Sequence, residues 1–405
     1  MKAVGIVAEY NPFHNGHRYH AEQARQLTGS DAVIAVMSGN FLQRGEPALV
    51  DKWTRTAMAL ENGIDLVIEL PYETATANAS GFADGAIRLL DAACCSSYCF
   101  GSEQGAIGPF AETLRRIKSN RPYYEEQVRN AVKSGISYPK ALNDAYELTI
   151  RQSQEDPVCA DLSKPNNILG FHYMEAADEI GSRMGAVTIP RLGAGYYDDI
   201  SADTHIASAT GIRKELFSEG GRLEGIRAYV PAATYELLSD WLAQRSRFGS
   251  WDSFYPLLRF QILRDGPERL AGIADITEGI EHLLYKAAKQ SEDFASFMAQ
   301  VKSKRYTWTR LQRMLVHILT GFTYEQRIAA GNPDHLRVLG MTAAGRRYLK
   351  EQKGRLALPA VSRLAAHDSV SADISAHVSD CYAFGIDPVH PLTGLDFRTP
   401  PLLSD

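Results

Sequence analysis

The hydrophobic positions of the first hundred residues form short runs that alternate with helix-like stretches. Four runs are almost wholly apolar, at residues 3–8, 32–37, 65–70 and 98–101. Between them, apolar residues recur at helical spacing over residues 17–27, 52–61 and 83–93. Such runs are typical of strands buried on both faces, so the pattern predicts a parallel sheet covered by helices on both sides. Right-handed crossovers then give a doubly wound α/β domain.

The rest of the chain is predominantly helical in pattern. Helical spacing fills residues 109–148, PNNILG (165–170) opens a further helix, and residues 186–190 form a late strand that ends at a proline. Ser208 caps a helix over residues 208–219, which two glycines end. From residue 231 we expect no further strand–helix alternation, only helices at 232–244, 254–264, 278–287, 294–301 and 309–319. The chain therefore divides into an α/β domain over residues 1–225 and a mostly α-helical domain over residues 226–405.

Composition supports this picture of a globular, two-domain protein. The 405 residues are 45% hydrophobic and 22% charged, which allows a sizeable core and excludes global disorder. The apolar runs are too short to cross a bilayer, and the N-terminus lacks the features of a signal peptide. Five cysteines without zinc-site spacing favour a reduced, cytoplasmic protein with no disulfides. The net charge of −5 argues against a protein that coats nucleic acid indiscriminately.

The loop after the first predicted strand carries the most informative motif, VAEYNPFHNGH at residues 7–17. Ligands of open α/β sheets bind at the carboxyl ends of strands, and a helix N-terminus offers free N–H groups and a partial positive charge suited to phosphate. His14 and His17 could donate N–H groups to phosphate oxygens during phosphoryl transfer, His17 either as a neutral ring or as a cation. The alternatives are a chance tetrapeptide in a turn or half of a metal site. Because no cysteine or acidic partner stands at a suitable spacing, we predict no metal ligands.

The loop resembles the HxGH signature of the nucleotidylyltransferase superfamily, which also contains the class I aminoacyl-tRNA synthetases. A second element, Ser208-Ala209-Thr210-Gly211-Ile212-Arg213, is similar to that superfamily's S-x-T-x-I-R motif, whose hydroxyls and arginine grip the ATP phosphates. One hydroxyl of the motif is missing, since the chain reads Ala207-Ser208-Ala209 there. Without the first motif, this segment would be read as an ordinary capped helix with a surface arginine.

The resemblance narrows to the tRNA(Met) cytidine acetate ligases over most of the chain. It rests on GIVAEYNPFHNGH, SGNFLQRGEPALVDKWTRTAMAL, PNNILG and the basic RYTWTRLQRMLVHIL. The resemblance implies a HUP-type nucleotide-binding fold and a ligase that uses ATP to convert acetate to acetyl-adenylate. It also implies that the acetyl group passes to the N4 amine of the wobble cytidine of elongator tRNA(Met), forming N4-acetylcytidine. We expect Mg²⁺ to help spread the charge that develops on the phosphates.

The resemblance further implies which residues serve the reaction. His14 and His17 would be catalytic. The ATP contacts would be Val7, Ala8, Glu9, Tyr10, Asn11, Pro12, Phe13, His14, Asn15, Gly16, His17, Arg18, Tyr19, His20, Gly101, Asn166, Arg191, Ser208, Thr210 and Arg213. Read without the resemblance, Gly101, Asn166 and Arg191 are a turn glycine, a helix cap and a solvated charge. Asn167 could replace Asn166 as the hydrogen-bonding residue.

The loop at residues 38–51 follows the second strand on the same rim of the sheet. With Lys52 behind it, this loop contains Gln43, Arg44 and Asp51. It could contact acetate, pyrophosphate or the cytidine, or cover the site. We favour a role as lid and pocket, without assigning individual residues.

A basic segment distinguishes the helical half. Residues 301–350 hold ten Lys or Arg and two acidic residues, 10 − 2 = +8, although the whole chain is at −5. Such asymmetry favours binding to a phosphate backbone, and we assign tRNA contacts to Lys302, Lys304, Arg305, Arg310 and Arg313. Tyr306 and Trp308 could stack on an unpaired anticodon base.

Two other functions remain open at this level. A small-molecule nucleotidylyltransferase would share the HxGH loop but leave the basic segment without a purpose. A non-catalytic RNA-binding protein that retains the nucleotide fold would not release pyrophosphate from ATP. We expect acetate and the tRNA as partners, with no membrane and no obligate protein partner.

Overall fold

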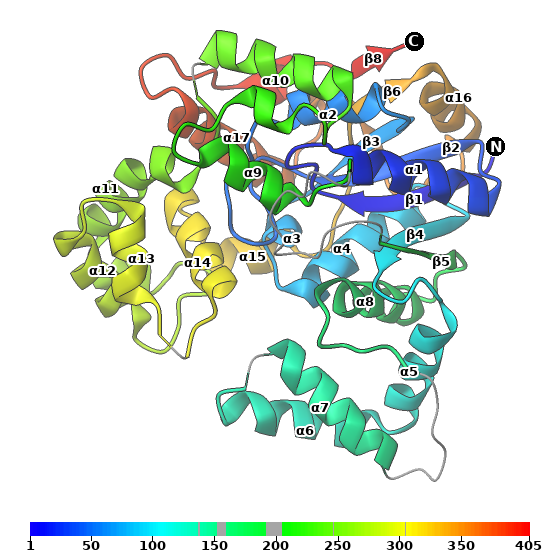
Figure 1. Cartoon of the computed structure of the whole chain (residues 1–405), viewed down its shortest axis with the longest axis horizontal. Coiled ribbons are helices and arrows are strands. Elements are labelled where there is room, and N and C mark those ends of the chain that lie inside the picture. The colour runs from blue at the N-terminus through cyan, green and yellow to red at the C-terminus, as the bar shows by residue number, and fades with distance from the viewer. Residues whose placement is uncertain (137, 152–158, 192–204, 246, 304) are drawn as a thin grey trace.

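In the computed structural model, the strands form one mixed sheet at the centre of the molecule (Figure 1). The structure describes residues 1–405 except 137, 152–158, 192–204, 246 and 304. Within these residues, the strand order is β5-β4-β1-β2-β3-β6-β7, and β8 pairs with β6. The strands are β1 (Ala3–Ala8), β2 (Ala32–Ser38), β3 (Leu66–Leu70), β4 (Ser97–Ser102), β5 (Gly185–Pro190), β6 (Leu336–Thr342), β7 (Ala360–Val361) and β8 (Leu402–Ser404).

The doubly wound α/β fold is confirmed by strands β1–β5, which are all parallel. Alternate residues of β2 enter different cores: Val33, Ala35 and Met37 pack in one, and Ile34 and Val36 in the other. The helices of this half are α1 (Asn15–Thr28), α2 (Lys52–Leu60), α3 (Tyr72–Ala75), α4 (Ala79–Ala92), α5 (Gly108–Ser119), α6 (Arg121–Lys133), α7 (Tyr138–Arg151), α8 (Pro165–Glu179), α9 (Ala209–Phe217) and the 3₁₀ turn η1 (Leu223–Ile226). Helices α1 and α2 contribute to the first core, and α4 and α8 to the second. A strand buried on both faces therefore explains the wholly apolar runs.

The expectation that no strand follows residue 231 is wrong. Strand β6 inserts antiparallel beside β3, with Ile68 opposite Val338, and carries β7 and β8 on its flank. Gly340 permits this, because a Cβ there would lie 2.7 Å from Thr56 Cγ2 on α2. The predicted division between residues 225 and 226 thus does not separate the sheet from the helices. The run that forms β6 is short and is interrupted by Arg337 and Gly340, so its sequence pattern does not indicate a strand. It becomes a strand because the edge of β3 offers it a pairing partner.

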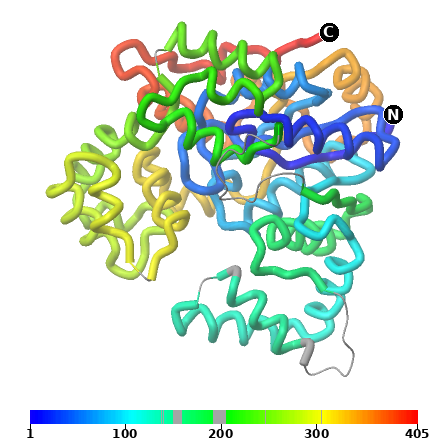
Figure 2. The backbone as a smooth tube through the Cα atoms, in the orientation of Figure 1, coloured from blue at the N-terminus to red at the C-terminus, as the bar shows by residue number. Residues whose placement is uncertain are grey.

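The later chain is otherwise helical, as expected. Its helices are α10 (Ala232–Arg245), α11 (Trp251–Leu270), α12 (Ile280–Gln290), α13 (Phe294–Val301), α14 (Trp308–Thr320), α15 (Tyr324–Ala330), α16 (Ala343–Gln352), the 3₁₀ turn η2 (Leu364–Ala366), α17 (Val370–Ile386) and α18 (Leu395–Arg398). Figure 2 shows α11–α14 as a yellow-green group on one side of the sheet, while the α6–α7 hairpin projects from another. Within the described residues, no helix combines the length and apolar character that a membrane span requires.

Candidate functional site

The HxGH loop folds as a helix cap built from its own histidines. His14 is the N-cap of α1: its Nδ1 accepts a hydrogen bond from the Gly16 N–H at 3.1 Å. The His14 N–H in turn donates to Nδ1 of His17 at 3.2 Å. The Asn15 N–H donates to the Tyr229 carbonyl, and the His17 N–H to the His14 carbonyl. The expectation that α1 offers free N–H groups to a phosphate is therefore wrong, because the N–H groups of its first turn already donate to acceptors within the protein.

The two imidazoles instead present a pair of N–H donors. Their rings stack with centroids 3.7 Å apart. Because each Nδ1 accepts a backbone N–H, a neutral ring carries its proton on Nε2. Neither Nε2 has a hydrogen-bonding partner among the described residues, so both are available to a ligand.

Burial keeps these rings neutral at physiological pH. Loss of solvent, reinforced by the charges of Arg191 and Arg213, lowers the pKa of His14 to about 3. Burial and the neighbouring charges of His14, His20 and Arg191 hold the pKa of His17 well below its usual value. Of the two protonation states the sequence left open for His17, the structure favours the neutral one.

Arg191 contacts two residues that are distant from it in sequence. It directly follows β5, and a Cβ added to Gly101 of β4 would lie 3.4 Å from its Cγ. Its Nη1 donates to Asn166 Oδ1 at 2.7 Å. The structure thus brings Gly101, Asn166 and Arg191 together beside the histidine pair, whose pKa values respond to the same arginine.

The structure gives the two asparagines of PNNILG different tasks. Asn167 is buried, and its amide accepts from the Glu103 N–H and donates to the Asp161 carbonyl. Asn166 is half-buried; its Nδ2 donates to Glu103 Oε1 at 2.7 Å, and its Oδ1 accepts from Arg191. The Glu103 carboxylate, which sequence reasoning missed, caps α8 by accepting from both asparagine N–H groups, at 3.2 and 2.9 Å. Asn167 is therefore committed to the fold, whereas Asn166 is held by Glu103 and Arg191, and its contact with a nucleotide stays a prediction.

The second motif, Ser208–Arg213, also lies near the histidine pair, because Arg213 bonds to the loop that carries it. Ser208 caps α9 by accepting from the Gly211 N–H at 3.0 Å, and Thr210 lies in the first turn. Arg213 donates to the Asn11 carbonyl at 2.9 Å and to the Glu46 carboxylate at 2.9 Å. Glu46 was missed by sequence reasoning, since only the fold places the loop at residues 38–51 beside α9.

The remaining residues of the stretch 7–20 separate into core, support and surface positions. Tyr10 and Phe13 are buried in the core, as are Asn11 and Pro12. The Asn15 amide donates to the carbonyls of His205 and Ala228, which ties the two motifs together. His20 Nε2 contacts the Cys99 carbonyl at 3.2 Å, Arg18 is exposed, and the remainder are half-buried: Val7, Ala8, Glu9, Gly16 and Tyr19.

The comparisons with known proteins agree with this geometry. Residues 1–391 match the family described as HIGH Nucleotidyl Transferase. The tRNA(Met) cytidine acetate ligase of Lysinibacillus sphaericus is 51% identical over 405 residues, 99% of this chain and 100% of that protein. The Bacillus subtilis protein of the same name is 41% identical, over 96% of this chain and 93% of its own. The chain belongs to this ligase family, within the HIGH nucleotidyl transferases.

Solved structures of the family share the whole fold. Thermotoga maritima TmcAL bound with alpha-thio ATP is 30% identical, with a TM-score of 0.86 over 100% of this chain and 99% of that one. The apo form of the same protein gives 31% identity and a TM-score of 0.88. The fold class and the resemblance drawn from the sequence are thereby confirmed.

The loop at residues 38–51 connects the family's signature histidines to the helical half. On one side, the Gln43 N–H donates to Glu9 Oε1 at 2.8 Å and the Leu49 N–H to Asn11 Oδ1 at 2.6 Å. On the other, Trp251 Nε1 donates to the Gly45 carbonyl at 3.1 Å. The same loop therefore contacts both the HxGH segment and α11.

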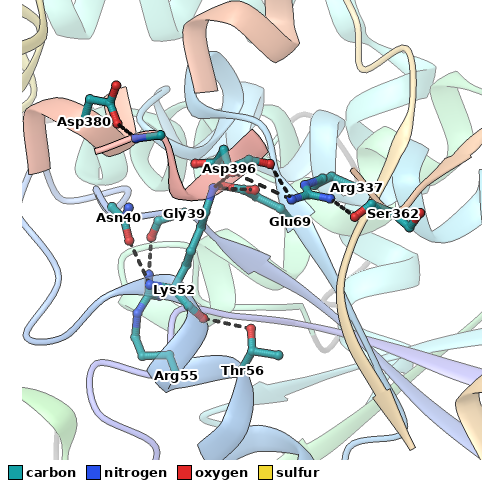
Figure 3. Close-up of polar contacts among 11 residues, drawn as sticks. Gly39, Asn40, Lys52, Arg55, Thr56, Glu69, Arg337, Ser362, Asp380 and Asp396 are labelled. Carbon is teal, nitrogen blue, oxygen red and sulfur yellow. Dashed lines mark hydrogen bonds and ion pairs between the residues drawn. The ribbon is translucent and has the colours of Figure 1, made fainter. Parts of the chain in front are cut away.

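Lys52, just after this loop, lies in a buried ion cluster and not in the site (Figure 3). Its Nζ donates to both oxygens of Glu69 at 2.8 Å and to Asp396 Oδ1 at 2.6 Å, and the side chain is fully buried. Arg337 donates to the carbonyl of Asp396 at 3.1 Å and to that of Ser362. Despite the cost of burial, the two carboxylates raise the pKa of Lys52, so it stays charged. Lys52 thus anchors the C-terminal segment to the sheet and is unavailable to a substrate.

Arg55, one turn further along α2, binds the backbone at the start of the loop at residues 38–51. It is fully buried, and its guanidinium donates to the carbonyls of Glu9, Ser38 and Gly39. These carbonyls lie at the end of β2 or just after β1 and β2, so one side chain fixes the paths of two loops of the site.

The basic segment divides between two places in the fold. Lys302, Arg305 and Arg310 lie at the start of α14 and just before it, whereas Arg346 and Arg347 are on α16 on the other side of the molecule (Figure 1). Arg313 is half-buried on α14, and Lys304 lies outside the described residues. The residues that give this segment its net charge of +8 therefore do not form one continuous surface.

The expectation that Tyr306 stacks on a base is wrong for the described structure. Its ring is buried, its hydroxyl donates to Glu278 at 3.2 Å, and the Arg310 guanidinium lies 4.9 Å from the ring centroid. Trp308 is 45% exposed and remains available to an unpaired base. Tyr306 instead makes a cation–π contact with Arg310.

Proposed function

We propose that this protein activates acetate with ATP to form acetyl-adenylate and transfers the acetyl group to the N4 amine of the wobble cytidine of elongator tRNA(Met). The product is N4-acetylcytidine. The observation that carries the proposal is the neutral, stacked His14–His17 pair at the carboxyl edge of the sheet, where Arg191 acts on both rings and Arg213 on His14. The names of the full-length relatives and the ATP analogue on the Thermotoga maritima protein support the choice of substrates.

In the first step, an acetate oxygen attacks the α-phosphorus of ATP and pyrophosphate leaves. The phosphate oxygens gain negative charge in the transition state, and preorganised donors stabilise that charge. The Nε2–H groups of His14 and His17 supply two such donors without a proton transfer, since both rings are already neutral. Arg191 and Arg213 add the positive charge that neutral rings lack. No covalent enzyme intermediate is required, because positioning the two reactants lowers the barrier.

In the second step, the cytidine amine attacks the acetyl carbonyl, AMP leaves with the electrons of the broken bond, and the amine loses a proton. An exocyclic amine is a weak nucleophile, so a mixed anhydride is a suitable donor. An anticodon base is already unpaired and reaches a pocket at low cost. The basic side chains at the start of α14 would hold the phosphate backbone, and the exposed Trp308 would offer a stacking surface.

Mg²⁺ would enter this site with the nucleotide. The carboxylates that contact the loops of the site are engaged: Glu9 accepts from the Gln43 N–H, and Glu46 accepts from Arg213. These residues do not form a protein cage for the ion, which suits Mg²⁺ carried on substrate phosphates.

The proposal also assigns the two parts of the chain. Residues 1–225, completed by β6–β8, would bind ATP and perform catalysis, and the helical region of residues 226–405 would bind tRNA. A tRNA substrate and five free cysteines are consistent with a reducing, cytoplasmic setting.

The test is mass spectrometry of nucleosides from tRNA incubated with the protein, ATP and isotopically labelled acetate. We expect label in N4-acetylcytidine from elongator tRNA(Met) only. His17→Asn keeps an acceptor for the His14 N–H but removes the Nε2 donor, so it should abolish acetate-dependent pyrophosphate release while tRNA binding persists. Pyrophosphate release with no labelled nucleoside would favour the small-molecule nucleotidylyltransferase, and neither product would favour the non-catalytic RNA-binding protein.

A further inference from the structure

A second histidine cluster lies outside the nucleotide site, around Asp334. His335 Nδ1 lies 2.6 Å from one oxygen of the Asp334 carboxylate, and His367 Nε2 lies 3.5 Å from the other. The two imidazole centroids are 4.5 Å apart. One ligand atom from each of the three residues lies within 4.8 Å of the other two.

The environment of His367 is unusual for a ring with no ligand. Its Nε2 is buried and has no hydrogen-bonding partner among the residues that the structure describes, although it faces a carboxylate. Buried polar atoms without a partner are rare, because each one loses its interaction with water. A cation between Asp334 and the two rings would satisfy this nitrogen.

We propose that Asp334, His335 and His367 bind a divalent transition-metal ion with the ligand preference of zinc. Two imidazoles and one carboxylate are a ligand set that suits Zn²⁺, with water in the fourth position. Tetrahedral ligands at about 2.0–2.2 Å from the ion lie roughly 3.3–3.6 Å from one another, so small rotations of the two rings close the site.

The site brings together two segments of the chain that are far apart in sequence. Asp334 and His335 precede β6, and His367 follows η2. Because β6 runs antiparallel to β3, its first residues lie at the carboxyl edge of the parallel strands, beyond β2 and β3 from the HxGH loop. The ion would fasten the segment between η2 and α17 to this edge, a structural role apart from the chemistry at His14 and His17.

This proposal departs from the sequence-based expectation of no metal ligands. His335 and His367 are separated by helix α16 and strand β7, so no local spacing indicates a site. Only the pairing of β6 and the path of η2 bring the rings to one carboxylate.

The experiment uses the full chain, stripped of metal with a chelator and dialysed. Zinc binding is measured by titration calorimetry, and Co²⁺ is added separately to record its visible d–d absorption, which reports inner-sphere ligands. We expect one ion per chain, a Co²⁺ spectrum of tetrahedral type, and a rise in the thermal midpoint when Zn²⁺ is added. Absence of saturable binding by the wild-type chain would overturn the proposal without any variant.

Variants then locate the ion. His367→Ala and Asp334→Asn should each weaken Zn²⁺ binding by about tenfold or more. His282→Ala removes an exposed histidine elsewhere and should bind as the wild type does. Circular dichroism in metal-free buffer verifies that each variant is folded. Undiminished one-to-one binding by His367→Ala and Asp334→Asn would refute the assignment, since the ion would then lie elsewhere.

Discussion

Gly45 packs directly against the backbone of Arg313. A Cβ atom at position 45 would lie 2.2 Å from the Arg313 backbone nitrogen, and the φ angle of Gly45 is +73°. The loop at residues 38–51 therefore touches α14 by a contact that no side chain can replace. The same loop donates hydrogen bonds to the side chains of Glu9 and Asn11. It therefore contacts both α14 and the HxGH segment.

We expect Gly45→Ala to disturb both activities of the protein. The new methyl group cannot be accommodated without moving the loop or α14, so unfolding should become easier by about 2 kcal/mol or more. Thermal unfolding and acetylation of tRNA should both be measured. Gly220→Ala is the matched control, because Gly220 has φ of +81° but no atom within 4 Å of an added Cβ. Equal effects of the two substitutions would show that backbone strain alone, and not the contact with α14, is responsible.

The two asparagines of PNNILG should respond differently to removal of their amides. Asn167→Ala leaves the Glu103 N–H and the Asp161 carbonyl without partners and should cost about 1–3 kcal/mol of stability. Asn166→Ala removes two exposed side-chain hydrogen bonds, to Glu103 and Arg191, and should lower the thermal midpoint less than Asn167→Ala does while raising the KM for ATP. Calorimetry and acetate-dependent pyrophosphate release separate the two outcomes. A raised KM in the Asn167 variant alone would reverse the assignment.

Charge reversal should distinguish the two basic regions. Lys302→Glu with Arg310→Glu should weaken tRNA binding by about tenfold or more and lower the slope of log K against log salt by roughly 2, because phosphate contacts release counterions. Acetate-dependent pyrophosphate release should not change. Arg346→Glu with Arg347→Glu makes the same change in charge on α16 and serves as the control. If the α16 variant loses as much affinity, the tRNA surface does not lie at α14.

Acid should destabilise the protein through His14. Its folded-state pKa of about 3 lies below the usual value of 6.5, so the unfolded chain binds more protons between these values. The free energy of unfolding therefore falls as pH drops through 6.5 toward 3, by about 2 kcal/mol at pH 5 from this residue alone. Urea unfolding at pH 7.5 and pH 5 measures the effect. His14→Asn keeps an N-cap acceptor but cannot titrate, so its stability should fall less; parallel losses in both proteins would argue against a neutral His14.

Removing the charge of Lys52 should be among the most damaging single changes in the core. Lys52→Met leaves the Glu69 and Asp396 carboxylates buried without their cation, at a cost of about 3–5 kcal/mol. Combining it with Glu69→Gln and Asp396→Asn removes the unpaired charges and should recover part of that loss. Lys118→Met breaks an exposed pair with Asp178 and should cost about 1 kcal/mol or less. Unfolding in urea ranks the three variants; a single Lys52→Met as mild as Lys118→Met would contradict the buried cluster.

The sequence by itself determined the elements whose signals are local. Strands β1–β5, the helices between them and the Ser208 cap follow from periodicity and capping, because these depend on residues close together along the chain. The HxGH loop could be placed after a buried strand and before a helix for the same reason.

Only the tertiary structure decided how distant segments share space. Pairing with β3 made a strand of Leu336–Thr342, and the Tyr229 carbonyl satisfied the N–H group of Asn15 in the first turn of α1. The different partners of Asn166 and Asn167, the burial of Tyr306 and the separation of the basic residues all depend on which neighbours the fold supplies. No pattern of period 2 or 3.6 contains that information, since the free energy of a buried polar group is set by partners far away in sequence.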